Sequence, residues 1–389
     1  MKSIRIYCKN DGRYHDVPKG ATLEEVYETL DLNLPCCVTS CKVNNRVEGL
    51  HYTINDSRDL EYLTLASPSG LRTYTRSLFF VLYKAVRDLY PEAELRIGTP
   101  VAGGYFCRLT LPGGITPEVP ERLRRRMAEI VASDLPFRRV TAHTTDAIEV
   151  FRRQGFTRKV LLLESIGDLY THYYTLGDTV DYFYSALLLR TGQLTVYDLV
   201  PFGEGLLLRV PDSEHPERLR PMTNQHKMFS VFQEQHRRQE ILGCTTVGEL
   251  NTLIRADHTN DLVNVAEALQ EKQIAQIADH IASHDALRVV LIAGPSSSGK
   301  TTFAKRLSVQ LMACGKKPVS ISLDNYFVDR TLTPLDETGD YDFEHIEALN
   351  LPLFNDQMNR LLVGEEVELP RYDFPTGMSV PSGRRLRLQ

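Results

Sequence analysis

The stretch 289–302, VVLIAGPSSSGKTT, constrains the fold and function of this chain more than any other. It opens with four apolar residues, 289–292, which predict a buried strand. Residues 294–301 fit the pattern G-x-x-x-x-G-K-[ST], and residues 303–313 continue with helical spacing. A glycine-rich turn between a strand and a helix lets backbone N–H groups surround phosphate oxygens at the helix N-terminus. We therefore predict a nucleoside triphosphate site here, rather than a chance glycine–serine turn.

Two side chains of this loop have specific expected roles. Lys300 can reach the β- and γ-phosphates, and the Thr301 hydroxyl can ligate Mg²⁺. We expect ATP and Mg²⁺ as cofactors, with Thr301 as the metal contact and Lys300 as a catalytic cation. The predicted ATP-binding residues are Gly294, Pro295, Ser296, Ser297, Ser298, Gly299, Lys300, Thr301 and Thr302.

Composition limits the other functions that the chain can have. Its 389 residues are enough for two to four domains, and a net charge of −5 provides no general attraction to nucleic acid or anionic membrane. No apolar run is long enough to span a bilayer and the N-terminus lacks a signal-peptide core, so we expect a cytoplasmic protein without a membrane partner.

Cys36, Cys37 and Cys41 cluster without a fourth ligand at ordinary spacing. We predict strand burial for them rather than a metal site.

Residues 1–66 predict a compact α+β unit. Thr22 and Glu25 form a capping-box pattern ahead of a short helix. Strands are expected at 3–8, 13–17, 37–43 and 59–65, and the helix at 22–30. This order is that of a β-grasp domain, and the segment resembles the TGS domain found at the front of threonyl-tRNA synthetases and some GTPases. Residues 66–70, ASPSG, predict a linker.

Residues 71–210 form a second predicted α+β unit. Apolar residues at helical spacing predict one helix around Leu78 and Leu82 and another at 121–135, and from 159 to 210 the pattern predicts strands. The outer side of the second helix carries Arg122, Arg124, Arg125 and Arg126. These arginines are interpreted as a solvated helix face rather than an RNA contact, because no aromatic residue interleaves them.

This second unit resembles the editing domain of threonyl-tRNA synthetases. The resemblance rests on RIGTPVAGGY at 96–105, ITPE at 115–118, DLPF at 134–137 and GDTVD at 177–181. In that family H-x-x-x-H and a later C-x-x-x-H supply the chemistry, and the matching positions here are Tyr74, Leu78, Phe183 and Leu187. None of these can ligate a metal or transfer a proton as imidazole or thiolate does. Asp181 is retained, and we expect a scaffold or binding surface without editing activity.

Residues 222–284 predict a helical connector, and a nucleotide-binding block follows from 287 to 389. Its second expected parallel strand, 318–323, ends at Asp324. In an open α/β sheet a carboxylate at this position faces the ligand, where it can accept a proton or help to hold Mg²⁺. A turn-forming Asp–Asn pair is the alternative interpretation.

The motifs of this block resemble uridine kinases in order and spacing: GPSSSGKTT, then LDNYF, DFEHIEAL at 342–349 and PRYDF at 370–374. The resemblance implies that Asp324 is the general base. It further implies that Glu344, flanked by Phe343 and His345, holds the ribose hydroxyls, and that Tyr372 contacts the base. Two departures stand out: the family has aspartate where this chain has Glu344, and the histidine expected soon after the tyrosine is missing.

Together the blocks resemble a bacterial group of long uridine kinase-type proteins. The expected fold is a multidomain α+β and α/β chain: β-grasp, editing-like domain, helical connector and P-loop parallel-sheet kinase domain. The kinase block is about half of the ~200 residues expected of such a domain, so we expect it to be incomplete, without its lid and arginines. The leading hypothesis is phosphorylation of a uridine or cytidine 5′-hydroxyl. The alternatives are a sugar-phosphate kinase and a nucleotide-switched, RNA-binding regulator that uses the N-terminal domains. The oligomeric state is left open.

Overall fold

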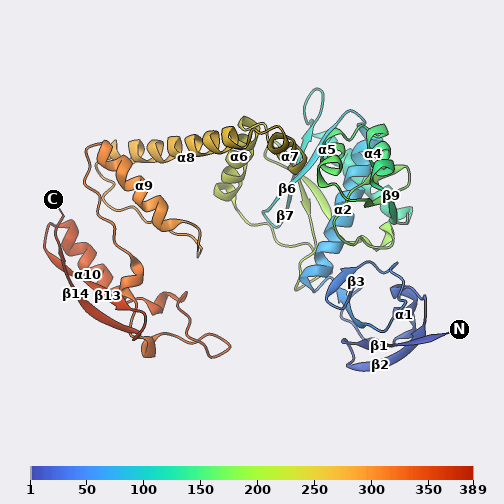
Figure 1. The fold of residues 1–389 in the computed structure, drawn as a ribbon, viewed down its shortest axis with the longest axis horizontal. Coiled ribbons are helices and arrows are strands. Elements are labelled where there is room, and N and C mark those ends of the chain that lie inside the picture. Colours follow the sequence, from blue (N-terminus) through green and yellow to red (C-terminus); the bar gives the residue numbers. More distant parts are fainter. Residues whose placement is uncertain (1, 296, 389) are drawn as a thin grey trace. The chain divides into compact units, whose positions relative to one another are not determined.

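The computed structural model describes residues 2–295 and 297–388 of the chain. These residues form two compact units, 1–259 and 260–389, coloured from blue to olive and from gold to red in Figure 1. No helix in either described range is long and apolar enough to cross a membrane.

The first unit begins with a five-stranded mixed sheet. Its strands are β1 (Ser3–Cys8), β2 (Arg13–Pro18), β3 (Val38–Val43), β4 (Arg46–Glu48) and β5 (Asp59–Thr64), in the order β2-β1-β5-β3-β4. Strands β1 and β5 pair in parallel, and the other pairs are antiparallel. The predicted capping box is present at the start of α1 (Leu23–Thr29), where Glu25 N–H donates to Thr22 Oγ1 at 3.2 Å. Leu23 and Val26 of α1 pack on Ile6 and Leu60 of the sheet.

A long helix, α2 (Pro68–Leu89), organises the following segment. Leu78, Leu82 and Val86 lie fully buried on its inner face, because apolar residues recur there at helical spacing. Two antiparallel sheets surround it. One has the order β11 (Asp198–Phe202), β12 (Gly205–Arg209), β7 (Gly104–Thr110) and β6 (Glu94–Val101), and the other β10 (Thr179–Asp181), β9 (Tyr170–Leu176) and β8 (Arg138–His143).

The helices of this segment are α3 (Glu118–Ala132), α4 (Thr144–Arg153) and α5 (Thr157–Ile166). Helix α5 corrects the prediction that strands begin at residue 159. Val160 and Leu163 are its buried positions, three residues apart, and Gly167 ends it with φ +78°. The run VLLLE is a short apolar stretch for which periodicity does not separate strand from helix. Packing of α5 against α4 and α7 selects the helix.

The segment predicted as a connector is helical and contains α6 (His226–Ile241), α7 (Val247–Arg255) and α8 (Thr259–Ala282). In the second unit Ile274 and Ala278 of α8 pack on Leu307 and Leu311 of α9 (Lys300–Ala313). Beyond α9 come η2 (Leu323–Tyr326), η3 (Arg330–Leu332), η4 (Ile346–Ala348), α10 (Leu351–Leu362) and the antiparallel hairpin of β13 (Val367–Asp373) and β14 (Met378–Leu386).

The parallel sheet expected in the second unit is not formed among its described residues. The stretches 289–292 and 318–322 have no regular secondary structure, and Val289, Val290 and Leu291 are exposed. An apolar run becomes a strand only where neighbouring strands accept and donate its backbone hydrogen bonds. Neither run has such a neighbour in the part of the chain that the structure describes. Each contributes one half-buried side chain, Ile292 or Ile321, to a local cluster.

Candidate functional site

The predicted phosphate loop leads directly into α9. Gly299 occupies the N-cap position with φ +85°, a left-handed conformation that glycine adopts without strain. Lys300 folds back over the loop, and its Nζ donates to the carbonyl oxygens of Gly294 at 2.7 Å and Pro295 at 3.0 Å. Ser296 lies outside the described residues.

The start of α9 is suited to an anionic ligand. Among the described residues no side chain caps this helix, and its first turn holds no acidic residue, so its first N–H groups are left for another acceptor. Lys300 and Thr301 are exposed there. Backbone donors, an ammonium and a hydroxyl at one helix terminus are the groups that ATP phosphates and Mg²⁺ require. The residues present therefore fit both cofactors.

Asp324 lies on the 3-10 turn η2, which a buried hydrogen bond anchors. Tyr326, 1% exposed, donates through its hydroxyl to Gln357 Oε1 at 2.7 Å. Gln357 in turn donates from Nε2 to the Glu368 carbonyl of β13 at 2.8 Å. The Asp324 side chain itself is exposed. The carboxylate is thus free for solvent or ligand while its backbone is attached to α10 and β13.

Phe327 follows this turn, and the aromatic residues of the predicted acceptor site pack around its ring. Its ring centroid lies 5.4 Å from that of Phe343, 5.4 Å from that of Tyr372 and 6.4 Å from that of Phe374. Tyr372 is only 4% exposed, and its buried hydroxyl has no hydrogen-bond partner among the described residues. Phe374 is 55% exposed. The open aromatic surface therefore belongs to Phe374, which sequence reasoning missed although it ends the PRYDF motif.

The other two predicted acceptor residues lie beside this cluster. Glu344 is exposed, and its backbone N–H donates to Asp342 Oδ1 at 3.0 Å. His345 caps η4 by accepting the Glu347 N–H at its Nδ1, 3.2 Å away. Gln357 was also missed, because nothing in the local sequence distinguishes it from other polar residues on α10.

The structure groups these residues into two sets. Lys300 and Thr301 belong to the α8–α9 pair, whereas Asp324, Phe343 and Tyr372 belong to the cluster built on α10 and β13. Among the described residues, no hydrogen bond, ion pair or ring contact joins one set to the other.

In the first unit, the four positions of the editing motif hold core residues. Tyr74, Leu78 and Leu187 are 0% exposed. The Tyr74 hydroxyl accepts the Val196 N–H at 2.8 Å, and the Phe183 ring lies 5.4 Å from that of Phe80. These side chains fill the interior of the domain. In the described ranges no three His, Cys, Asp or Glu residues are grouped as metal ligands.

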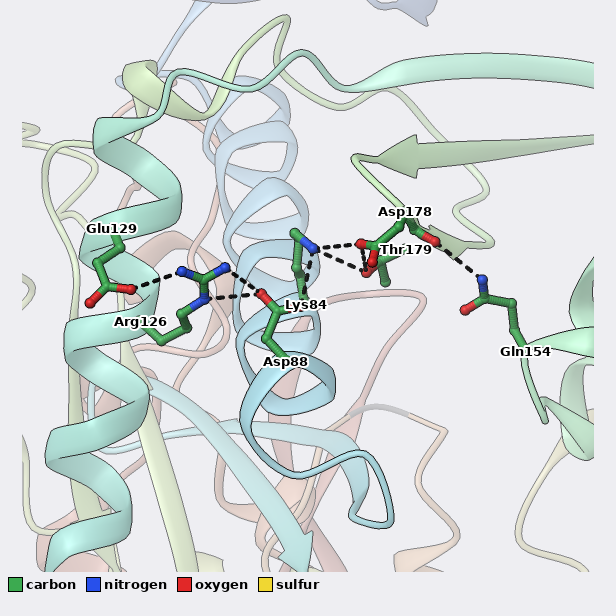
Figure 2. Close-up of polar contacts among 7 residues, drawn as sticks. All are labelled: Lys84, Asp88, Arg126, Glu129, Gln154, Asp178 and Thr179. Atoms are coloured by element: carbon green, nitrogen blue, oxygen red, sulfur yellow. Dashed lines mark hydrogen bonds and ion pairs between the residues drawn. The ribbon is translucent and has the colours of Figure 1, made fainter.

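Two of the four arginines of α3, Arg124 and Arg126, form close ion pairs within the fold. Figure 2 shows Arg126 between Asp88 of α2, at 2.9 Å, and Glu129 of its own helix, at 2.8 Å. Arg124 pairs with Glu121 and Asp198, and Arg122 lies over the Tyr90 ring at 5.3 Å. Guanidinium groups with carboxylate partners in place are poor phosphate contacts. This geometry favours the interpretation of a solvated, structural helix face.

Comparison with known proteins assigns a class to the second unit. Residues 289–387 match the Phosphoribulokinase / Uridine kinase family. The C-terminal part of the chain is therefore similar to the P-loop kinases of this family.

The N-terminal region is similar to other proteins. Threonine–tRNA ligase of Desulforamulus reducens is 28% identical over 250 residues, which are 62% of this chain and 39% of that protein. The ligase of Symbiobacterium thermophilum is 28% identical over 201 residues, 51% of this chain and 31% of its own length, and that of Clostridium novyi is 30% identical over 179 residues, 46% and 28%. The chain thus spans well under half the length of these relatives. Their similarity agrees with the TGS-like and editing-like architecture.

Proposed function

We propose that this protein is a cytoplasmic, ATP-dependent nucleoside kinase that phosphorylates the 5′-hydroxyl of uridine or cytidine. The observation that carries the proposal is the family match over 289–387, which includes the phosphate loop, Asp324 and the aromatic cluster around Phe327. The uncapped start of α9 and the left-handed Gly299 support phosphate binding by this loop.

The chain's own residues suggest a division of roles. Lys300 and the first N–H groups of α9 offset the negative charge of the phosphates, and Thr301 provides the metal contact. Mg-ATP supplies the phosphoryl group when bound. Asp324 accepts the proton of the attacking hydroxyl, since it is exposed and its turn is anchored through Tyr326. Glu344 accepts hydrogen bonds from the ribose, and Phe374, the exposed member of the aromatic cluster that Tyr372 supports, contacts the base.

Product formation tests this proposal. The full chain is incubated with Mg-ATP and a panel of nucleosides and sugar phosphates, and the products are identified by mass spectrometry. We expect UMP or CMP, with a rate about 10²–10⁴-fold lower for Asp324→Asn because general base catalysis is lost. The matched control, Asp340→Asn, changes an exposed carboxylate in the same unit and should leave the rate unchanged. If only sugar phosphates are phosphorylated, the acceptor is a sugar phosphate, the family's other acceptor class, and the nucleoside assignment is wrong. Tight Mg-ATP binding without any product would contradict a kinase reaction by this chain.

A second candidate is an RNA-binding regulator that uses the nucleotide as a switch. The similarity of the N-terminal region to threonine–tRNA ligases motivates it. Filter binding with transfer RNA at several salt concentrations tests it, since phosphate contacts make the affinity fall as salt rises. Absence of binding at physiological salt would exclude this candidate.

A further inference from the structure

A cavity of about 150 Å³ lies in the first unit, between the β3–β4 hairpin and the β8–β9 strands. Arg46 and Glu48 line it from β4, Arg139 from β8, and Tyr170 and His172 from β9. Of the four positions of the editing motif, only Phe183 reaches it. The cavity therefore meets the editing-motif positions at Phe183, whereas Tyr74, Leu78 and Leu187 are buried in the core.

The basic part of the cavity lining favours an anion. Two guanidinium groups share one carboxylate: Arg46 Nε lies 3.2 Å from Glu48 Oε1, and Arg139 Nη1 lies 3.5 Å from Glu48 Oε2. This trio keeps one positive charge. Burial, and then the charges of Arg139 and Arg46, lower the pKa of His172. The charges of the arginines therefore act on the cavity lining at His172.

Another part of the lining presents aromatic surface. Tyr184 is 77% exposed, with its ring centroid 4.9 Å from that of Tyr182, and Tyr170 is 52% exposed, 4.5 Å from the His143 ring. Neighbouring rings hold both tyrosines in place while one side of each stays open. Asp168 also lines the cavity and provides an acceptor for hydroxyl or amino groups.

We propose that this cavity binds a nucleotide. The phosphate lies at Arg46 and Arg139, the base stacks on the open tyrosines, and Asp168 accepts a hydrogen bond from the sugar or the base. A cavity of 150 Å³ holds one ring-sized group, and the remainder of the ligand extends over Tyr170 and Tyr184. A free amino acid would satisfy the arginines and Asp168 but would leave the tyrosines uncovered. The nucleotide is either free or the terminal unit of a single-stranded RNA, because both present the same groups.

Calorimetric titration of the full chain carrying Lys300→Met tests this proposal, since that change weakens the phosphate loop of the other unit. The probes are AMP, UMP, uridine, inorganic phosphate and a short single-stranded RNA. We expect nucleotide binding that Tyr184→Ala or Arg46→Gln weakens about fivefold to a hundredfold, in line with the loss of one stacking or phosphate contact. Tyr14→Ala is the matched control, because Tyr14 is 64% exposed and lies on β2, outside the cavity lining.

Comparing the RNA probe with the mononucleotide probes distinguishes an RNA terminus from a free nucleotide as the natural ligand. RNA that binds at least about tenfold tighter than UMP or AMP identifies an RNA terminus, and equal affinities identify a free nucleotide. Inorganic phosphate that binds as tightly as the nucleotides, or affinities unchanged by both Tyr184→Ala and Arg46→Gln, would overturn the proposal. So would the absence of any nucleotide binding. Both substituted side chains are exposed, and circular dichroism verifies that the variants fold.

Discussion

Lys84 and Asp178 are joined by an ion pair in which Lys84 Nζ donates to Asp178 Oδ1 at 2.7 Å (Figure 2). Lys84 is 6% exposed on α2, and it also donates to Asp88 Oδ1 at 3.1 Å. Asp178 lies in the turn between β9 and β10. A nearly buried ammonium is tolerated only when acceptors surround it. The pair therefore attaches the central helix to the three-stranded sheet.

Replacing this ammonium should destabilise the first unit. Lys84→Met keeps the length of the side chain and removes its hydrogen bonds, which are worth about 1.5–3 kcal/mol when a charged group takes part. We expect a loss of that size in urea unfolding followed by circular dichroism. Lys19→Met is the control, because Lys19 is exposed in a turn. Equal unfolding curves for the two variants would show that the Lys84 contacts contribute no net stability.

The same pair predicts a dependence on pH. The hydrogen bond from Lys84 lowers the pKa of Asp178 below its ordinary value of 3.8. A carboxyl whose pKa is lower in the folded state stabilises the fold above the unfolded pKa, and this stability is lost as pH falls through the folded pKa. The difference in unfolding free energy between wild type and Asp178→Asn should therefore be constant from pH 7 to about 5 and shrink below about 4. A difference that persists at pH 2 would contradict this assignment.

Restoring a histidine of the editing motif should damage the core. Leu187 is fully buried among apolar residues, so Leu187→His leaves a buried imidazole without partners and costs about 2–5 kcal/mol. Leu187→Met should cost less than about 1.5 kcal/mol, because it conserves volume. Thermal unfolding with and without Zn²⁺ measures both effects. Rescue of Leu187→His by Zn²⁺ would contradict the assignment of this interior as a core without metal ligands.

Gly299 should be needed for the conformation of the phosphate loop. A Cβ at this position meets open space, so Gly299→Ala acts only through its positive φ, at a cost of about 1–2 kcal/mol. Gly315→Ala is the matched control: it has φ +76° and equally open surroundings, but it follows α9 instead of preceding it. Both variants should lose similar stability, and only Gly299→Ala should lose affinity for Mg-ATP in a titration. Equal affinity losses would indicate that general destabilisation, not loop geometry, is measured.

The Tyr326–Gln357 hydrogen bond should hold the turn that carries Asp324. Gln357→Leu leaves the Tyr326 hydroxyl and the Glu368 carbonyl without their partners, at about 1–3 kcal/mol. Hydrogen exchange at the backbone of residues 323–327 should accelerate accordingly, while α9 is unaffected. Gln270→Leu on the exposed surface of α8 is the control. Unchanged exchange in the turn would show that packing of Phe327, not this bond, anchors it.

Features decided by a few neighbouring residues could be predicted from the sequence. The Thr22–Glu25 capping box and the helix that follows the phosphate loop both appear in the structure, because one side chain or one glycine determines each. The kinase family of residues 289–387 was also recognisable from short motifs.

Features that need partners far away in the chain were decided by the tertiary structure. The apolar runs at 289–292 and 318–322 have strand composition but no paired strand among the described residues, whereas VLLLE became α5 through packing on α4 and α7. Three other features also depend on contacts between residues distant in sequence: the burial of Tyr372, the Lys84–Asp178 pair and the cavity at Arg139. Hydrogen-bond partners and burial are properties of the folded neighbourhood, so the local sequence specifies what each residue can do and the tertiary contacts select what it does.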